Sequence, residues 1–350
     1  MSVPRTLFVG KGKGAVTWYR CALPAMVLGQ DWVGVAGEPG GLHFRTGLTP
    51  EPPTEAAFDD YEVLVLQQPQ GPAWLAAIRR WQARGITVLY EVDDWLRGIR
   101  KLRNHDFKDH FGRDDVEAYE LCMRAADGVI CSTEWLARRY QSVNPNTFVC
   151  RNGLDLKRYA LTRPEREQVA IGWAGATGHV DGVKPWVAGV AEVMRAHQDT
   201  RFISVGQPFA QWLEPEFGAQ RCLSVPFSAF DTYPAAMTLF DVALAPAGKG
   251  SFFQGKSDLR WLEAGALGIP LIADPEVYPD IEHGVTGFHA ATPEQMGSIL
   301  AELVADRPLR ERVGAAARAH VERHRSAEVA AEQWAGVLRE VRPAGSAAAA

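Results

Sequence analysis

Residues 245–274 read APAGKGSFFQGKSDLRWLEAGALGIPLIAD, and this stretch is the most informative part of the chain about its fold. A short apolar run opens into a glycine-rich loop, and a helical pattern then extends to Gly268 before a second apolar run begins. Glycines let the backbone approach a ligand closely, and a helix N-terminus offers free N–H groups and positive potential. Lys256 adds a charge there, and Glu263 follows about two turns into the helix. The pattern predicts a diphosphate site with a ribose-binding carboxylate; the alternative is a surface glutamate behind a solvated loop.

Short apolar runs alternate with helical patterns on both sides of this stretch. The runs are RTLFVG, EVLVLQQ, ITVLYEV, DGVIC and TFVCRN in the first half, and VAIGWAG, RFISVG, RCLSV, DVALAP and IPLIAD in the second. Two consecutive series of buried strands and helices predict an α/β fold with two doubly wound parallel-sheet domains. Ligands of such sheets bind outside the carboxyl ends of the strands, so loops of both domains are expected to line a cleft.

A polar segment, LDLKRYALTRPEREQ, separates the two series and marks the domain boundary. We therefore expect an N-terminal domain over residues 1–160 and a C-terminal domain over residues 161–325. A helix over residues 326–341 is expected to cross back to the N-terminal domain. The alanine-rich tail over residues 342–350 has the low complexity of a disordered segment.

Composition narrows the classes of function. The net charge of −5 provides no overall attraction to nucleic acid or anionic lipid, so any such contact needs a local patch. The five cysteines are scattered and never spaced as CxxC, which argues against a disulfide scaffold or a zinc site. Neither a signal peptide nor an apolar run of about 20 residues is evident. These features are typical of a cytoplasmic protein, with membrane contact limited to the periphery.

The segment GKSDLRWLEAGALGIPLIA resembles the signature of retaining GT-B glycosyltransferases of the group-1 (glycosyltransferase family 4-like) superfamily. The resemblance implies sugar transfer from a UDP- or GDP-sugar, with retention and without a metal or other cofactor. It implies that Glu263 holds the ribose and that Lys256, followed by Ser257, neutralises the departing diphosphate. One position departs from the family, which often has a glutamate where this chain has Gly255. Backbone N–H groups of Gly255 and Lys256, or the Gln254 amide, are the expected replacements.

Further donor-binding residues follow from two other loops. The segment IGWAGATGHVDGVKPW resembles the loop after the first strand of the family's nucleotide-binding domain, which places Gly175, Thr177 and His179 beside the phosphates. The segment VGKGKGAVTWYR puts Gly12 and Gly14 after the first strand of the chain. It is neither a Walker motif nor a GxGxxG fingerprint. In the family this loop approaches the donor phosphates; the alternative is a plain tight turn.

Two carboxylates end a buried strand in the segment TVLYEVDDWL. Asp93 and Asp94 lie where carboxylates can bind a metal or move a proton. In the family this strand end often carries a His-Asp pair near the acceptor hydroxyl, so Asp93 is expected to orient the acceptor or act as its base. The alternative is a capping role for the next helix. Together with Lys256, these are the predicted catalytic residues, and no metal site is expected.

A basic segment, RGIRKLRNHDFKDHFGR, follows the two carboxylates directly. Such a segment is usually a solvated face, but its placement suggests contact with the acceptor. The predicted acceptor-binding residues are Arg20, Trp95, Arg100, Lys101, Arg103 and His105.

Several functions remain open. The leading hypothesis is a glycosyltransferase acting on a glycan, a lipid-linked acceptor or a small molecule. A second is a phage-type DNA glycosyltransferase acting on hydroxymethylated pyrimidines, with the basic segment holding the DNA backbone. A nucleotide-sugar 2-epimerase, or a nucleotide-sugar-binding protein without catalytic activity, belongs to other classes.

Overall fold

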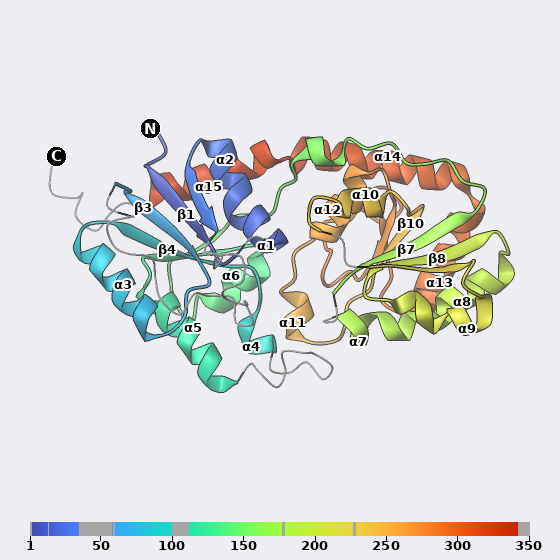
Figure 1. The fold of residues 1–350 in the computed structure, drawn as a ribbon, viewed down its shortest axis with the longest axis horizontal. Coiled ribbons are helices and arrows are strands. Elements are labelled where there is room, and N and C mark those ends of the chain that lie inside the picture. The colour runs from blue at the N-terminus through green and yellow to red at the C-terminus, as the bar shows by residue number, and fades with distance from the viewer. Residues whose placement is uncertain are drawn as a thin grey trace.

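Two six-stranded parallel sheets form the centres of two domains that stand side by side (Figure 1). The computed structural model describes residues 2–12, 14–34, 58, 60–99, 112–176, 179–226 and 229–341. The predicted α/β class, with two doubly wound parallel sheets, is confirmed.

The sheet of the N-terminal domain has the strand order β2-β1-β3-β4-β5-β6. Its strands and helices are β1 (Thr6–Gly10), α1 (Ala15–Thr17), α2 (Leu23–Leu28), β2 (Asp31–Gly34), β3 (Val63–Gln67), α3 (Pro72–Ala83), β4 (Thr87–Val92), α4 (Leu96–Ile99), α5 (Arg113–Ala125), β5 (Gly128–Cys131), α6 (Glu134–Tyr140) and β6 (Thr147–Val149). A π-helical turn over Trp18–Ala22 joins α1 to α2. The strand order reverses between β1 and β3, so a crevice for ligands is expected at the carboxyl ends of these two strands.

The sheet of the C-terminal domain has the order β12-β11-β10-β7-β8-β9 and reverses between β7 and β10. Its elements are β7 (Val169–Gly175), α7 (Val180–Val183), α8 (Val187–Ala196), β8 (Thr200–Gly206), α9 (Glu214–Phe217), β9 (Cys222–Val225), α10 (Tyr233–Met237), β10 (Val242–Ala245), α11 (Ser251–Gln254), α12 (Leu259–Ala266), β11 (Leu271–Ala273), β12 (Phe288–His289), α13 (Pro293–Ala305) and α14 (Arg307–His324). The order is that of a dinucleotide-binding sheet, with the crevice between β7 and β10.

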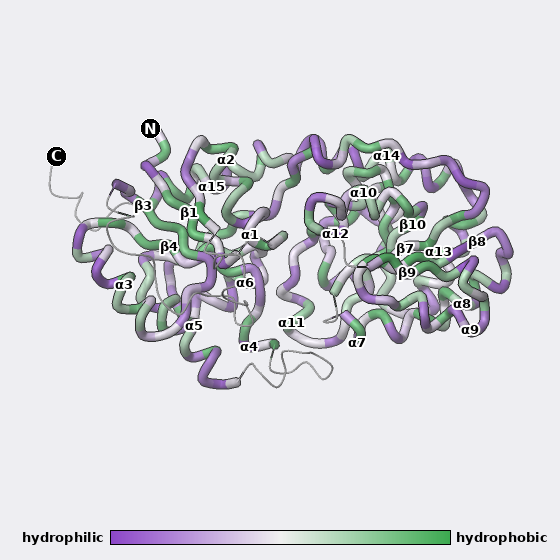
Figure 2. The backbone as a smooth tube through the Cα atoms, viewed as in Figure 1, coloured by the Kyte–Doolittle hydropathy of each residue, from purple (hydrophilic) through white to green (hydrophobic). Residues whose placement is uncertain are grey.

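Hydrophobic strands lie inside both domains, and the helices turn their polar sides outward (Figure 2). β1, β3 and β4 are buried along their whole length, as expected for parallel strands covered by helices on both faces. One apolar cluster joins the domains, because Tyr19 and Leu23 of the N-terminal domain pack with Phe252 and Trp261 of the C-terminal domain. The domains therefore share part of their buried apolar surface.

The last helix, α15 (Ala327–Glu340), belongs to the N-terminal domain although it ends the described chain. It packs against α2, and the ring centroids of Trp334 and Phe8 lie 5.5 Å apart. Where the chain returns, the N–H of Ala327 donates to the Leu154 carbonyl at 2.8 Å, and Leu154 pairs with Ser326 in a parallel bridge. The two segments that cross between the domains thus run side by side.

Candidate active site

The glycine-rich loop of the C-terminal domain lies at the carboxyl edge of its sheet. β7 ends at Gly175, and the loop after β10 begins at Pro246, next to the point where the strand order reverses. A Cβ atom on Gly182 of α7 would lie 2.7 Å from backbone atoms of Ala247 and Gly248, so only glycine allows α7 to pack this closely on the loop. The loop is therefore held where doubly wound sheets bind their ligands.

The helix that follows begins slightly later than the sequence predicts. α12 starts at Leu259, with Asp258 at its N-cap, and the short helix α11 lies within the loop that leads to it. The Asp258 carboxylate does not cap α12, because Arg325 binds both of its oxygens at 2.6 and 2.8 Å. The Ser257 hydroxyl accepts a 3.0 Å hydrogen bond from the Asn152 amide. Contacts from outside this segment thus fix the residues that lead into the helix.

Gly255 lies in the contact between the domains. A Cβ atom at this position would be 3.1 Å from side-chain atoms of Leu136 and Trp95 and 3.4 Å from Trp135. Trp95 itself is only 7% exposed, and its ring centroid lies 5.7 Å from that of Trp135. The glycine thus lets the two domains approach closely, and most of Trp95, a predicted acceptor-binding residue, is buried in this contact.

Lys256 and Asp94 bring the two domains together through opposite charges. The Lys256 Nζ lies 2.6 Å from Oδ1 of Asp94, and both side chains are about a quarter exposed. The ammonium also lies 4.3 Å from the Phe252 ring centre. The Lys256 backbone N–H donates to the Phe253 carbonyl at 3.0 Å and is therefore engaged within the loop rather than turned to a ligand. The predicted phosphate-binding cation thus faces a predicted catalytic carboxylate.

Asp93 lies next to this pair and faces the N-terminal crevice. Its Oδ1 accepts a 2.9 Å hydrogen bond from the Gln68 amide. Desolvation raises the pKa of Asp93, and the neighbouring Asp94 raises it further, while Lys11 and Lys256 act in the opposite direction. A carboxylate with a raised pKa is a better proton acceptor, which suits the predicted role.

Glu263 is buried between the domains. Its Oε1 accepts hydrogen bonds from the hydroxyls of Tyr19 at 2.9 Å and Tyr159 at 3.3 Å. Burial raises the pKa of Glu263 to about 7, although the Tyr19 hydrogen bond and the Arg260 charge oppose this shift. A carboxylate has up to four acceptor sites, so Glu263 can also accept hydrogen bonds from other hydroxyl groups, such as those of a ribose.

Arg260 is a candidate site residue that the sequence analysis missed. It lies on α12 between Lys256 and Glu263, and its guanidinium lies against Gly175, where a Cβ would be 2.7 Å from Nη2. The guanidinium carbon is 5.6 Å from the Trp173 ring centre, and no carboxylate among the described residues pairs with it. Lys256 precedes the helix, but Arg260 and Glu263 are three residues apart on α12 and share one face of it, which was a usable signal.

Arg20 lies too deep to reach an acceptor. Its side chain is 1% exposed, and its Nε donates to Glu91 at 2.6 Å. One terminal nitrogen donates to the Asn152 side-chain oxygen at 3.0 Å and also to the Cys150 carbonyl. Burial raises the pKa of Glu91 to about 7, against the lowering effect of Arg20. Arg20 therefore joins β4 to the end of β6 and the first crossing segment, instead of facing the acceptor as predicted.

The predicted glycines and histidine occupy different positions around the crevices. Gly12 is buried, and its carbonyl would lie 2.6 Å from a Cβ on Gly34, so the loop after β1 abuts the end of β2. Gly14 is exposed at the start of α1. His179 begins α7, with its ring 6.4 Å from that of Phe253. Thr177 lies outside the described residues.

The remaining acceptor-binding predictions cannot be placed. Arg100, Lys101, Arg103 and His105 all lie outside the described residues. Within the described part, a pocket of about 190 Å³ lies where the domains meet, lined by Thr17, Trp18, Ala22, Trp32, Gly34 and Phe230.

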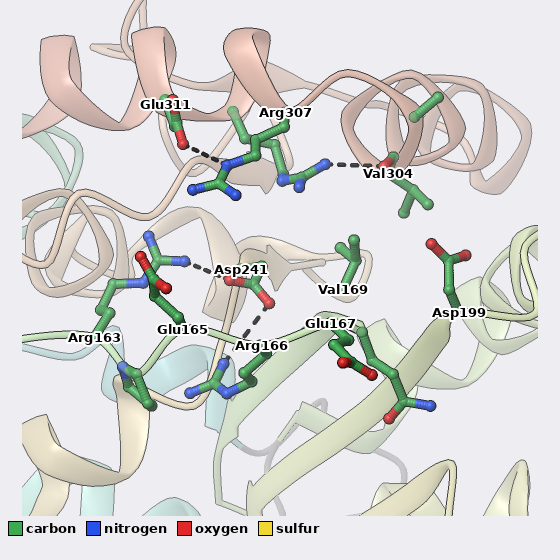
Figure 3. Close-up of a pocket in the computed structure, with 14 residues that line it drawn as sticks. Arg163, Glu165, Arg166, Glu167, Val169, Asp199, Asp241, Val304, Arg307 and Glu311 are labelled. Atoms are coloured by element: carbon green, nitrogen blue, oxygen red, sulfur yellow. Dashed lines mark hydrogen bonds and ion pairs between the residues drawn. The ribbon is translucent and has the colours of Figure 1, made fainter.

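A larger pocket of about 600 Å³ lies at the opposite edge of the C-terminal sheet (Figure 3). It is lined by the start of β7 and by parts of α13 and α14. Its arginines are already engaged, since Arg163 binds Asp241 at 2.6 Å and Arg307 binds Glu311 at 2.7 Å. Because this is the amino edge of the strands, it is not the edge at which such sheets bind ligands.

The described residues also bear on metals and membranes. Among them, His, Cys, Asp and Glu side chains form no group of three or more suited to a metal ion. None of the described helices combines the length and apolar character required to cross a bilayer.

Comparison with known proteins shows which sequence family and which folds the chain resembles. The model of a family described as glycosyl transferase-like matches residues 189–336, which include α12 and the loop before it. No curated protein matches the chain. Similar solved structures include HepE of Anabaena in complex with UDP and glucose, with a TM-score of 0.68 and 15% identity over 96% of this chain and 99% of HepE.

Two other structures agree with this fold. Sucrose-phosphate synthase from Thermosynechococcus elongatus has a TM-score of 0.67 and 15% identity over 96% of this chain and 99% of its own. A glycosyltransferase from Rickettsia africae has a TM-score of 0.64 and 12% identity over 97% of this chain and 98% of its own. The chain therefore has the GT-B fold of glycosyltransferases, and its residues 189–336 match the glycosyl transferase-like family.

Proposed function

We propose that the protein transfers a sugar from a nucleotide-sugar donor to an acceptor hydroxyl. One observation carries the proposal: Lys256, Arg260 and Glu263 lie within one short segment at the carboxyl edge of the C-terminal sheet, and Lys256 pairs with Asp94 across the domain contact. Two cations beside a carboxylate match a diphosphate joined to a ribose. HepE binds UDP and UDP-glucose, which supports a UDP-sugar as the donor.

In this mechanism most of the catalysis is electrostatic. Lys256 and Arg260 stabilise the negative charge that develops on the diphosphate as its bond to the anomeric carbon breaks. To do so, Lys256 exchanges its contact with Asp94 for one with the diphosphate when the donor binds. Asp93 orients the acceptor hydroxyl and accepts its proton while the new bond to the anomeric carbon forms. Glu263 holds the ribose, and retention of configuration follows from the resemblance described above.

The acceptor is proposed to be a glycan, a lipid-linked acceptor or a small molecule, and the reaction to be cytoplasmic and independent of metal. The test is a panel of labelled nucleotide-sugars, including UDP-glucose, offered with pooled glycans, lipid-linked acceptors and hydroxymethylated DNA. We expect binding of a UDP-sugar by calorimetry and transfer of the label to one acceptor class. Conversion of the donor to its 2-epimer without transfer would assign an epimerase instead. Failure of every nucleotide-sugar to bind at millimolar concentration would contradict the proposal.

A matched pair of variants places the activity at the proposed site. Lys256→Met removes the ammonium and keeps the length of the side chain, and we expect it to abolish most of the transfer. Lys184→Met changes an exposed lysine outside the proposed contacts and serves as the control. Equal activity of the two variants would show that the reaction occurs elsewhere.

A further inference from the structure

Gln68 adopts a backbone conformation that is rare for its residue type. Its φ is 48°, and it is the only non-glycine residue with a positive φ among those that the structure describes. A glutamine adopts this left-handed region at a cost in free energy, and such residues concentrate at functional sites. The residue is 3% exposed, so the conformation is held inside the domain.

The position of Gln68 in the fold is equally specific. It follows β3 directly, next to the loop after β1, at the point where the strand order of the N-terminal sheet reverses. Its backbone N–H donates to the carbonyl of Glu91 on the neighbouring strand at 3.0 Å. This is the crevice where a doubly wound sheet binds its ligand.

Two opposite charges determine how the Gln68 amide is oriented. The Lys11 ammonium donates to its Oε1, and its Nε2 donates to Oδ1 of Asp93 at 2.9 Å. A lysine offers only donors and an ionised carboxylate only acceptors, so the reversed amide would lose both hydrogen bonds. No described residue donates to the other carboxylate oxygen of Asp93.

We propose that Gln68 is a positioning residue for Asp93, which it holds with one carboxylate oxygen engaged and the other turned to the acceptor hydroxyl. The proposal rests on the proposed function, because it takes Asp93 as the group that receives the acceptor. Lys11 acts through Gln68 by fixing the direction of its amide. The left-handed backbone of Gln68 brings the side chain back over the strand end, between the loop after β1 and the end of β4.

Three substitutions separate the amide from the backbone. Gln68→Gly and Gln68→Ala both remove the amide, but only glycine accepts the positive φ without strain. Gln68→Glu keeps the shape and replaces the donor by a second carboxylate. We expect all three to lower the rate of UDP release from UDP-glucose about tenfold or more, with water as the acceptor and with donor affinity unchanged. We expect Gln68→Gly to unfold at a higher temperature than Gln68→Ala.

The pH profile distinguishes positioning from packing. Besides Gln68, two carboxylates and three cations act on Asp93. They are Glu91 and Asp94 on the same strand and its end, Lys11 from the loop after β1, Arg20 from the turn after α1, and Lys256 from the C-terminal domain. A new carboxylate at position 68 raises the pKa of Asp93, so the Gln68→Glu profile moves to higher pH by about one unit or more.

Gln82→Glu is the matched control for this shift. The Gln82 amide also donates to an aspartate, Asp127, at 2.9 Å, but it lies on α3 at the amino edge of the sheet. We expect Gln82→Glu to leave the pH profile unchanged. A Gln68→Gly variant with wild-type turnover, or equal pH profiles for Gln68→Glu and Gln82→Glu, would overturn the proposal.

A second measurement does not depend on the reaction. The Asp93 carboxyl signal, identified by its loss in Asp93→Asn, is titrated by carbon NMR in the wild-type protein and in Gln68→Glu and Gln82→Glu. We expect the midpoint to rise only in Gln68→Glu. If the midpoint rises only in Gln68→Glu but the wild-type protein binds no UDP-glucose, the contact stands and the proposed function fails. If it transfers sugar but the midpoint does not move, the positioning role of Gln68 fails.

Discussion

The hydroxyl of Tyr19 in the N-terminal domain donates a 2.9 Å hydrogen bond to Glu263 in the C-terminal domain. The Tyr159 hydroxyl lies 2.9 Å from that of Tyr19 and contacts the same carboxylate oxygen. The carboxylate proposed to hold the ribose is therefore also a contact between the domains. Because phenol and ribose hydroxyls are donors of the same kind, a bound ribose shares Glu263 with these tyrosines or replaces one of them.

We predict that Lys256→Ala and Glu263→Ala each weaken the binding of a nucleotide-sugar. Loss of a hydrogen bond to a charged group costs about 1.5–3 kcal/mol, which corresponds to a fall in affinity of roughly tenfold or more. Calorimetry with UDP-glucose measures the change. Glu302→Ala, on the exposed side of α13, is the control. Wild-type affinity in both site variants would remove the basis of the proposed donor site.

The raised pKa of Glu263 predicts how stability depends on pH. Since this pKa is about 7 in the folded protein and near 4.5 in an unfolded chain, the folded state holds the proton more tightly. The stability contributed by protonation is fully present below about pH 4.5 and is lost as the pH rises towards 7. Glu263→Gln should therefore gain stability relative to the wild type between pH 4.5 and 8, by on the order of 3 kcal/mol. Denaturant unfolding across this range measures the difference, and a constant difference would contradict the buried carboxylate.

Gly255→Glu introduces the glutamate that the group-1 glycosyltransferases often have at this position. We expect this substitution to push the two domains apart. A side chain there must displace Leu136 or Trp95, since a Cβ alone already lies 3.1 Å from both. Overpacking of this kind typically costs about 1–3 kcal/mol. Gly336→Glu, at an open position on α15, is the control. Thermal unfolding and small-angle scattering should show a less stable and more extended Gly255→Glu protein, and no change in either quantity would argue against a close contact.

We predict that turnover does not require a divalent cation. Among the described residues, no cluster of three or more His, Cys, Asp and Glu side chains suited to a metal ion accompanies Asp93 and Asp94. Activity measured in EDTA should equal activity in added Mg²⁺ or Mn²⁺. Loss of activity in EDTA, with recovery on addition of Mn²⁺, would identify a metal-dependent mechanism.

Removal of Arg20 should destabilise the N-terminal domain strongly. Its partner Glu91 is 0% exposed, and breaking a buried ion pair from one side typically costs about 3–5 kcal/mol. We expect Arg20→Met to unfold at a much lower denaturant concentration and Arg20→Met with Glu91→Gln to recover part of the loss. If the single and double variants are equally stable, the unpaired charge of Glu91 is not the cause of the lost stability.

The parts of the fold that the sequence predicts are those set by local patterns. Buried parallel strands appear as continuous apolar runs, and the loop and helix around Lys256 and Glu263 follow from glycines and helical spacing within one short segment. Arg260 belongs to the same helix, three residues before Glu263, and could have been found there. The short helix α11 was not expected, because its four residues carry no periodicity.

The contacts between distant segments could not be predicted in this way. Tyr19 and Glu263 are 244 residues apart, and Arg20 meets Glu91 from 71 residues away. The spacing of residues within one helix or strand does not indicate which side chains of a distant segment will contact them. Arg20 is therefore expected near the ligands from its place one turn into the helix after the first glycine-rich loop, although it is one of the most deeply buried side chains of the described residues.

The chain crosses between the domains twice, and the backbones of the two crossings are hydrogen-bonded to each other at Leu154 and Ala327. Two adjacent connections between domains permit rotation about the line through both of them and resist rotation about other axes. Opening of the domains therefore has one preferred direction, which separates Lys256 from Asp94 more than it separates residues beside the hinge, such as Asn152 and Arg325. Cutting either crossing would leave a single flexible link and remove this guidance without touching any side chain of the proposed site.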